Sequence, residues 1–132
     1  MDKYIGSMLG GRYQIEEIVG VGGMAVVYRA RDTILGRDVA LKVLKKEFAE
    51  DPDIRKRFSI ESRAVAKLSH HNIVSVFDVG SEDGTDYIVM ELIEGITLKQ
   101  YLQRKGHLSW EETIFFAEQV ARALMHAHSR GI

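Results

Sequence analysis

The segment GVGGMAVVY at residues 20–28 decides how the N-terminal half of the chain is interpreted. Its first six residues satisfy the spacing G-x-G-x-x-[GA], which occurs in more than one kind of phosphate-binding site. In a dinucleotide site a helix follows the glycines, whereas Val26, Val27 and Tyr28 are β-branched or aromatic and favour a strand. The glycines are therefore expected at the tip of a β-hairpin. From this segment alone, a plain hairpin with a glycine-rich turn remains an alternative.

Short β-branched runs around this segment predict an antiparallel sheet. The expected strands are residues 13–19, 25–31, 38–44, 73–79 and 87–91. Asp83 and Gly84, between the last two, are typical of a hairpin turn. Asp51 followed by Pro52 predicts the start of a helix that extends to about Ser69. The first 91 residues are thus expected to form five strands and one helix.

The pattern becomes helical beyond residue 95. Thr97 and Ser109 are each followed three residues later by Gln or Glu, the capping-box spacing, and Gly106 separates the two expected helices. The second helix, residues 109–130, is apolar over much of its circumference, which is typical of a helix inside a larger body. We therefore expect the chain to be a piece of a longer protein. We also expect it to self-associate through this exposed helix.

Composition excludes several classes of function. The 132 residues include 18 basic and 19 acidic residues, so nothing indicates a nucleic acid or an anionic membrane as partner. Cysteine is absent, which excludes disulfides and thiolate metal sites. No signal peptide and no apolar run of about 18 residues is visible. His126 and His128 are two positions apart on a helix and point to different sides, so no metal site is expected.

Two charged residues lie within apolar patterns. Lys42 has apolar neighbours on an expected inner strand, where a lysine is costly to bury without an anion. Glu61 lies on the expected apolar face of its helix, with apolar residues three, four and seven positions further along. Each alone has an ordinary explanation, a lysine extending from an edge strand or a solvated helix glutamate. Together they are expected to pair.

These segments, in this order and at this spacing, resemble protein kinases. Further matching segments are HHNIV (70–74), YIVME (87–91) and GITL (95–98). The stretch GGMA at residues 22–25, with Tyr28, is similar to bacterial serine/threonine kinases of the type that carries extracellular PASTA repeats. The resemblance covers about residues 10–132. Ala25 and His71 replace the family's usual glycine and proline, and neither puts the assignment in doubt.

The resemblance implies an α+β fold and an ATP site. Residues 1–12 would be an N-terminal extension, 13–91 the kinase N-lobe, and 92–132 the hinge with the first two helices of an incomplete C-lobe. Lys42 would contact the α- and β-phosphates of ATP and pair with Glu61. The implied nucleotide-binding residues are Val19, Gly20, Val21, Gly22, Gly23, Met24, Ala25, Val26, Val27, Ala40, Lys42, Met90, Glu91 and Ile93.

Within this set the resemblance also implies separate roles. Val19, Val27 and Ala40 would form the roof of the adenine pocket, and Met90 would be the gatekeeper behind it. The backbone of Glu91 and of Ile93 would make the hinge hydrogen bonds to adenine.

The implied activity is transfer of the ATP γ-phosphate to protein serine or threonine hydroxyls. The His-Arg-Asp catalytic loop and the Asp-Phe-Gly motif that binds Mg²⁺ are expected beyond residue 132, so the chain alone is expected to be inactive. A pseudokinase, or another nucleotide-binding scaffold module, is the main alternative, and a small-molecule kinase of the same general fold is another. By resemblance only, the domain would be cytoplasmic and part of a single-pass membrane protein.

Overall fold

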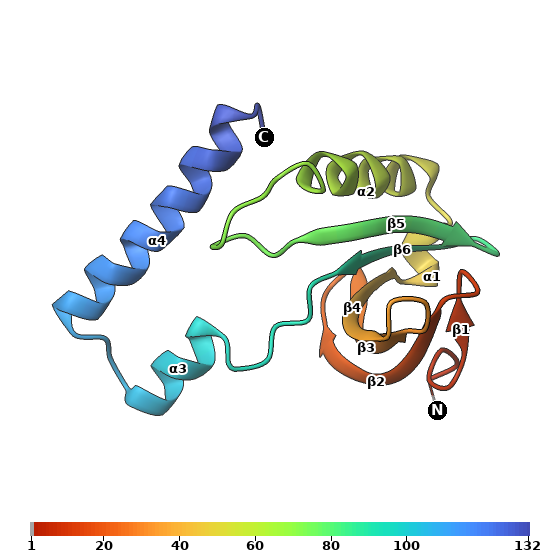
Figure 1. Ribbon diagram of the computed structural model, residues 1–132, viewed down its shortest axis with the longest axis horizontal. Helices are drawn as coiled ribbons and strands as arrows, with labels where there is room; N and C mark the ends of the chain where they lie inside the picture. Colours follow the sequence, from red (N-terminus) through yellow and green to blue (C-terminus); the bar gives the residue numbers. More distant parts are fainter. Residues whose placement is uncertain (1) are drawn as a thin grey trace. The chain divides into compact units, whose positions relative to one another are not determined.

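The computed structural model describes residues 2–132, which form two compact units. The first unit comprises the chain up to Lys67 together with Ser75–Leu92. The second comprises Leu68–Val74 together with Ile93–Ile132. Figure 1 shows that the first unit contains the strands with helices α1 and α2, whereas α3 and α4 belong to the second.

A six-stranded antiparallel sheet forms the centre of the first unit, with the spatial order β1-β2-β3-β4-β6-β5. The strands are β1 (Met8–Leu9), β2 (Tyr13–Val21), β3 (Ala25–Asp32), β4 (Arg37–Leu44), β5 (Val76–Glu82) and β6 (Thr85–Met90). The predicted α+β class is confirmed, but the predicted count of five strands is wrong. The additional strand, β1, has two residues, Met8 opposite Gln14 and Leu9 opposite Tyr13. It is too short to show a repeating apolar pattern.

The β5–β6 hairpin contains the turn that the sequence predicts. Asp83 and Gly84 have φ angles of 49° and 76°, as a two-residue type I′ turn requires. β5 begins at Val76, three residues later than predicted. The delay has a local cause, because the N–H of Ile73 donates to the carbonyl of His70 in a turn instead of joining the sheet.

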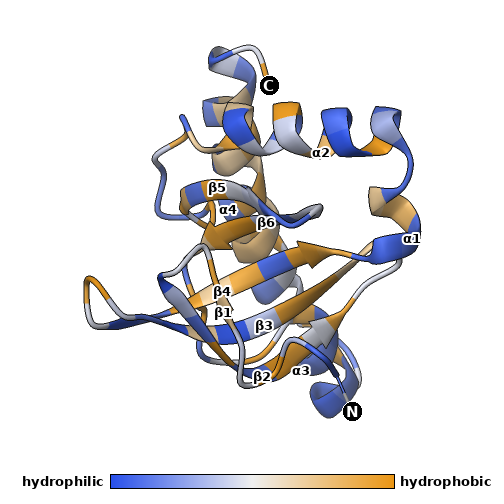
Figure 2. Cartoon of the chain, turned by 90° about the vertical axis from the view of Figure 1, so that its right-hand side faces the viewer, coloured by the Kyte–Doolittle hydropathy of each residue, from blue (hydrophilic) through white to orange (hydrophobic). Residues whose placement is uncertain are grey.

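The two faces of the sheet bury different clusters, because successive side chains of a strand point to opposite faces. On one face Leu41 and Val43 of β4 belong to a large core with Tyr28 and Val89. On the other face Leu44 and Ile88 pack with Phe58 of α2. Figure 2 shows hydrophobic and hydrophilic positions mixed along β3, β4 and β6.

Helix α2 (Pro52–Val65) begins as predicted and ends earlier. The Asp51 side chain accepts hydrogen bonds from the N–H groups of Asp53 (2.9 Å) and Ile54 (3.4 Å), and Pro52 is the first helical residue. The last turn tightens where the N–H of Lys67 donates to the carbonyl of Ala64, so the helix does not reach Ser69. A short helix that the sequence did not predict, α1 (Lys46–Ala49), precedes α2.

An ion pair joins the start of β2 to the β3–β4 turn. The Arg12 guanidinium donates to both carboxylate oxygens of Asp32, at 2.9 and 2.8 Å. Asp32 is buried and also accepts from the N–H groups of Ile34 and Leu35. The hydrogen bonds from Arg12, followed by those from the turn backbone, hold the pKa of Asp32 well below its ordinary value.

Two glycines allow the Tyr87 ring to lie against the backbone. A methyl group at Gly80, directly opposite Tyr87 in the sheet, would lie 2.3 Å from the ring carbon Cζ. A methyl group at Gly10 would lie 2.4 Å from the Tyr87 hydroxyl. The buried ring therefore fits only because both positions lack a side chain.

The second unit contains α3 (Leu98–Lys105) and α4 (Trp110–Ser129). Both predicted capping boxes are confirmed, at Thr97 with Gln100 and at Ser109 with Glu112. The Asn72 amide ties the preceding segment to α4, donating at 3.0 Å to the carbonyl and at 2.9 Å to the side chain of Gln119. Within residues 2–132, no helix combines the length and apolar character needed to cross a membrane.

Three histidines meet at the same place in this unit, which the sequence analysis did not predict. The rings of His70 and His71 stack with centroids 4.5 Å apart, and His126 lies 5.2 Å from His70. His126 Nδ1 lies 3.1 Å from the Arg130 guanidinium, and its buried Nε2 has no hydrogen-bond partner among residues 2–132. Burial, with the nearby charges of Arg130 and His70, lowers the pKa of His126.

Replacing Gly80 by alanine should destabilise the sheet by about 1–3 kcal/mol, because the added methyl group overlaps the Tyr87 ring. Urea unfolding of Gly80→Ala measures this change. In the Tyr87→Leu background the same substitution should cost much less, since the overlap is removed. Equal costs in both backgrounds would show that the contact with Tyr87 is not the cause.

Acidification should selectively weaken the contact of α4 with the histidine segment. A histidine whose pKa is lowered in the folded state binds fewer protons there, so stability is lost as the pH falls below the unfolded value of 6.5 and levels off below the folded pKa. Circular dichroism measures the urea midpoint of helix unfolding at pH 7.5 and at pH 5. The decrease in this midpoint between the two pH values should be smaller in His126→Phe than in the unmodified chain. His107→Phe, outside the cluster, should keep the full pH dependence.

Candidate functional site

The glycine-rich segment forms a hairpin, as predicted. Gly20 and Val21 end β2, and β3 begins at Ala25, with Val21 opposite Val26. No helix follows the glycines, so the dinucleotide alternative does not fit. The N–H of Gly22 donates to the carbonyl of Ala25 at 2.8 Å, and a methyl group at Gly22 would lie 3.3 Å from that oxygen.

The turn is also bonded to the end of β4. Lys45 donates from its backbone N–H to the carbonyl of Met24 at 2.9 Å and from Nζ to the carbonyl of Gly23 at 3.1 Å. No atom outside the adjacent chain lies within 4 Å of the position of a methyl group on Gly23. Val21 is 70% exposed, so this side chain is not part of the core. The turn is therefore fixed to Lys45 by hydrogen bonds, while its backbone at Gly23 remains accessible.

Four of the predicted side chains share one face of the sheet. Val27 is directly opposite Lys42, and Ala40 is directly opposite Met90. Directly opposite residues of an antiparallel pair lie on the same face, and Ala40 and Lys42 are two positions apart on β4. This is the face on which α2 packs. Val26 points to the opposite face with Val43, so only its backbone lies near the turn.

The predicted burial of Lys42 and Glu61 is wrong. Both side chains are exposed, and among residues 2–132 no ion pair joins them. The apolar neighbours of Lys42 in the sequence, Leu41 and Val43, point to the other face and cannot cover it. On α2 the buried positions are Phe58 and Ser62, which leaves Glu61 on the solvent side.

The predicted hinge residues lie at the end of β6 and beyond it. The N–H of Glu91 donates to the carbonyl of Ser75 at 2.9 Å, and the N–H of Ser75 donates to the Glu91 carboxylate at 3.2 Å. A ligand at Glu91 could therefore use the backbone carbonyl but not the N–H. Val19 is 49% exposed on β2, and Ile93, in the second unit, is 60% exposed.

Helix α2 is attached to the sheet through a contact that the sequence did not predict. Arg55 donates to both carboxylate oxygens of Asp86, at 2.5 and 3.0 Å, and to the Ser81 hydroxyl at 3.4 Å. The hydrogen bonds from Arg55 lower the pKa of Asp86. The two residues are 31 positions apart, so no local pattern could have paired them. Because Arg55 lies near the start of α2, the contact fixes that end of the helix.

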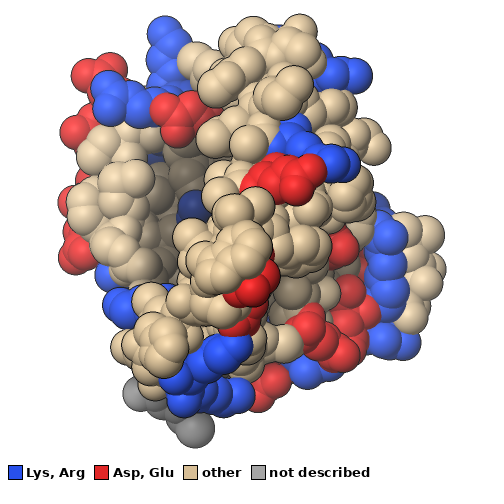
Figure 3. Space-filling view, turned by 90° about the vertical axis from the view of Figure 1, so that its left-hand side faces the viewer, with Lys and Arg blue, Asp and Glu red and all other residues tan. Residues whose placement is uncertain are grey.

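The charged side chains of the described residues identify no metal site. Among residues 2–132, no three His, Cys, Asp or Glu side chains are placed to hold a metal ion. Basic and acidic side chains are mixed over the face drawn in Figure 3. The absence of a nucleic acid partner stays a prediction.

The comparisons with known proteins agree with the hairpin and the sheet. Residues 13–132 match the family model described as protein kinase domain, and the chain belongs to that family. The relatives are bacterial serine/threonine-protein kinases. A probable one from Clostridium acetobutylicum is 48% identical over 97% of this chain, and PrkC of Bacillus subtilis is 46% identical over 97%. The predicted resemblance to bacterial serine/threonine kinases is thus confirmed.

Solved structures show the same fold. The crystal structure of the Mycobacterium tuberculosis PknI kinase domain matches 96% of this chain with a TM-score of 0.84 and 32% identity, over 52% of its own length. The chain spans 20% of the length of each of the two relatives named above. What those whole proteins do is therefore not carried directly to these residues.

Replacing Asp86 by asparagine should loosen the start of α2. Asparagine keeps one acceptor oxygen but loses the other and the negative charge, which should raise amide hydrogen exchange in the first turns of α2 about tenfold. Asp83→Asn is a matched control, since it removes the same charge from the same hairpin and asparagine tolerates the positive φ there. If both variants exchange alike, the Arg55 contact does not fix the helix.

Proposed function

We propose that this chain is the ATP-binding part of a protein serine/threonine kinase, which transfers the ATP γ-phosphate to serine or threonine hydroxyls of proteins. The observation that carries the proposal is the position of Lys42. Its side chain is exposed and lies directly opposite Val27, two positions beyond Ala25, where β3 leaves the glycine-rich turn. A backbone turn with little side-chain bulk and a neighbouring ammonium group together suit a triphosphate.

In this proposal the backbone of residues 20–26 covers the phosphates. Val27 and Ala40, with Val19, provide apolar contact for adenine, and Met90 closes the back of that contact. The carbonyl of Glu91 and the backbone of Ile93 make the polar contacts to the base. Support comes from the shared face of Val27, Ala40, Lys42 and Met90.

Catalysis further requires Glu61 to approach Lys42. Because Arg55 bonds the start of α2 to Asp86, we propose that the helix pivots about this end and brings Glu61 inward. The ammonium of Lys42 would then be held by Glu61 while it contacts the phosphates. Both side chains are exposed, so neither has a buried contact of its own to break.

We assign no magnesium ligand to these residues. No group of three carboxylates or histidines suits a metal within residues 2–132, and the resemblance puts the magnesium ligands and the catalytic aspartate outside the chain. We propose that the chain alone transfers no phosphate. We also propose the division into extension 1–12, N-lobe 13–91, and hinge with C-lobe helices 92–132.

A nucleotide-binding module without phosphate transfer is the alternative, and it is favoured by the lack of an ion pair between Lys42 and Glu61 among residues 2–132. The protein substrates, the cytoplasmic location and the membrane anchor rest on family resemblance. Self-association through α4 is supported by its exposed apolar residues, among them Trp110 at 71% and Met125 at 70%.

In the full-length protein, Lys42→Met should lower kcat/KM for phosphorylation of a protein substrate about 10²–10³-fold, because one cation that positions the ATP phosphates is lost. Phosphate transfer from radiolabelled ATP measures this. Lys56→Met, an exposed lysine of α2, is the charge-matched control and should keep its activity. Nucleotide binding without any transfer by the unmodified full-length protein would favour the alternative.

A further inference from the structure

An open pocket of about 230 Å³ lies on the sheet face opposite Lys42, next to β3, β4 and the N-terminal segment. Val26 and Val43, directly opposite each other in the sheet, and the Tyr28 side chain line its apolar part. Tyr28 and Val43 are buried, so this part belongs to the rigid core. The pocket therefore has a fixed apolar wall.

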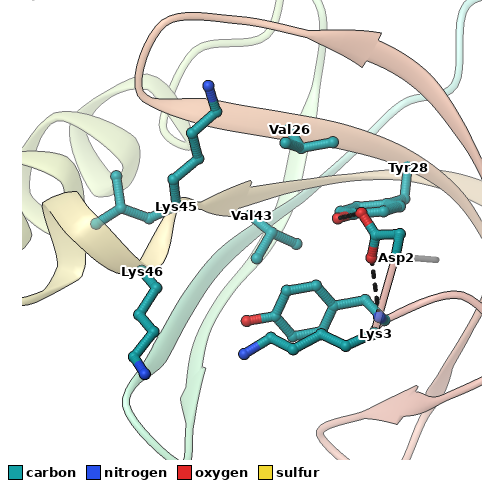
Figure 4. A pocket seen from close by; sticks show the side chains of 9 residues that line it. Asp2, Lys3, Val26, Tyr28, Val43, Lys45 and Lys46 are labelled. Atoms are coloured by element: carbon teal, nitrogen blue, oxygen red, sulfur yellow. Dashed lines mark hydrogen bonds between the residues drawn. The ribbon is translucent and has the colours of Figure 1, made fainter.

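Three lysines surround this wall. Lys3, Lys45 and Lys46 all line the pocket, and among residues 2–132 none of them forms an ion pair. Figure 4 shows the ammonium ends of Lys3 and Lys46 on the same side of Val43, whereas Lys45 extends the other way, toward the glycine-rich turn. There Lys45 Nζ donates to the carbonyl of Gly23. Two ammonium groups thus remain for a ligand at the opening.

The acidic residue that lines the pocket is already engaged. Asp2 accepts from the N–H of Tyr4 at 2.9 Å through Oδ1 and from the Tyr28 hydroxyl at 2.7 Å through Oδ2. Its carboxylate therefore holds the N-terminal segment against β3. Lys3 lies 4.8 Å from the centre of the Tyr4 ring, which keeps its ammonium group near an aromatic surface.

We propose that this pocket binds a small organic anion, a phosphate or carboxylate on a short apolar or aromatic body. The anionic group is held by Lys3 and Lys46, and the body packs on Val43 and Tyr4. The volume suits a ligand of about ten non-hydrogen atoms, at roughly 20 Å³ each when packed as in a protein interior. The apolar wall disfavours a bare inorganic ion, and the lysines disfavour a neutral ligand.

The site has a direct connection to the glycine-rich turn. Lys45 contributes its side chain to the pocket and its ammonium to Gly23. An anion in the pocket attracts that ammonium and competes with the Gly23 carbonyl for it. Binding in this pocket therefore weakens the hydrogen bond from Lys45 to Gly23, although the ligand makes no contact on the Lys42 face.

Phenyl phosphate is a suitable probe, and nuclear magnetic resonance can assign its position. Saturable shifts are expected at the Val43 methyl groups and the Tyr4 ring, with a dissociation constant of about 1 mM. Ile88, on the Lys42 face, reports separately on the site proposed for ATP. A response at Ile88 alone would overturn the pocket proposal. A response at Val43 alone would support the pocket proposal and would not bear on the ATP site, which the Lys42→Met experiment tests.

The double variant Lys3→Gln with Lys46→Gln should weaken phenyl phosphate at least tenfold. The control Lys56→Gln with Lys67→Gln removes the same charge from exposed positions of or beside α2 and should bind normally. All four lysines are exposed, so melting temperatures should be unchanged. The proposal is overturned if both double variants lose binding equally, if inorganic phosphate binds as tightly as phenyl phosphate, or if phenol does.

Discussion

The two-residue period of β4 is the constraint on which both sites depend. Leu41 and Val43 enter the large core on one face, so Ala40 and Lys42 must lie on the other. A shift of one residue in the pairing of β4 would put Lys42 into the core and Leu41 into solvent, at a large cost in free energy. The buried core therefore fixes the lysine's direction, although it makes no contact with the ammonium group.

Helix α2 is attached to the sheet by two contacts of different kinds. One end is fixed by an ion pair, Arg55 with Asp86, and the middle by apolar packing of Phe58 against Leu44 and Ile88. Glu61 follows Phe58 by less than one turn, yet it lies outside the packed side. The movement proposed for α2 is a rotation about this fixed end, and it involves an apolar contact that includes partly buried residues.

Local chemistry explains what could be predicted from the sequence. The caps at Asp51, Thr97 and Ser109 and the turn at Asp83–Gly84 depend on residues within three or four positions, and all formed as expected. The failures that concern the site were not local. Lys42 is exposed although α2 packs on its face of the sheet, against Leu44 and Ile88. The Arg55–Asp86 pair spans 31 positions. The glycine hairpin was predictable and the helix contact was not, since only the first is encoded in adjacent residues.

The N-terminal segment shows how far the sheet depends on such distant contacts. Asp2 bonds to Tyr28, Gly10 donates its N–H to Glu82 at 2.7 Å, and Arg12 pairs with buried Asp32. These residues belong to the segment that was expected as an N-terminal extension, and their contacts reach β3, β5 and the β3–β4 turn. They cover the large core from the side opposite Lys42. The segment that completes this core also supplies Lys3 and Tyr4 to the pocket proposed to bind an anion. This pocket therefore exists only when the segment is folded onto the sheet.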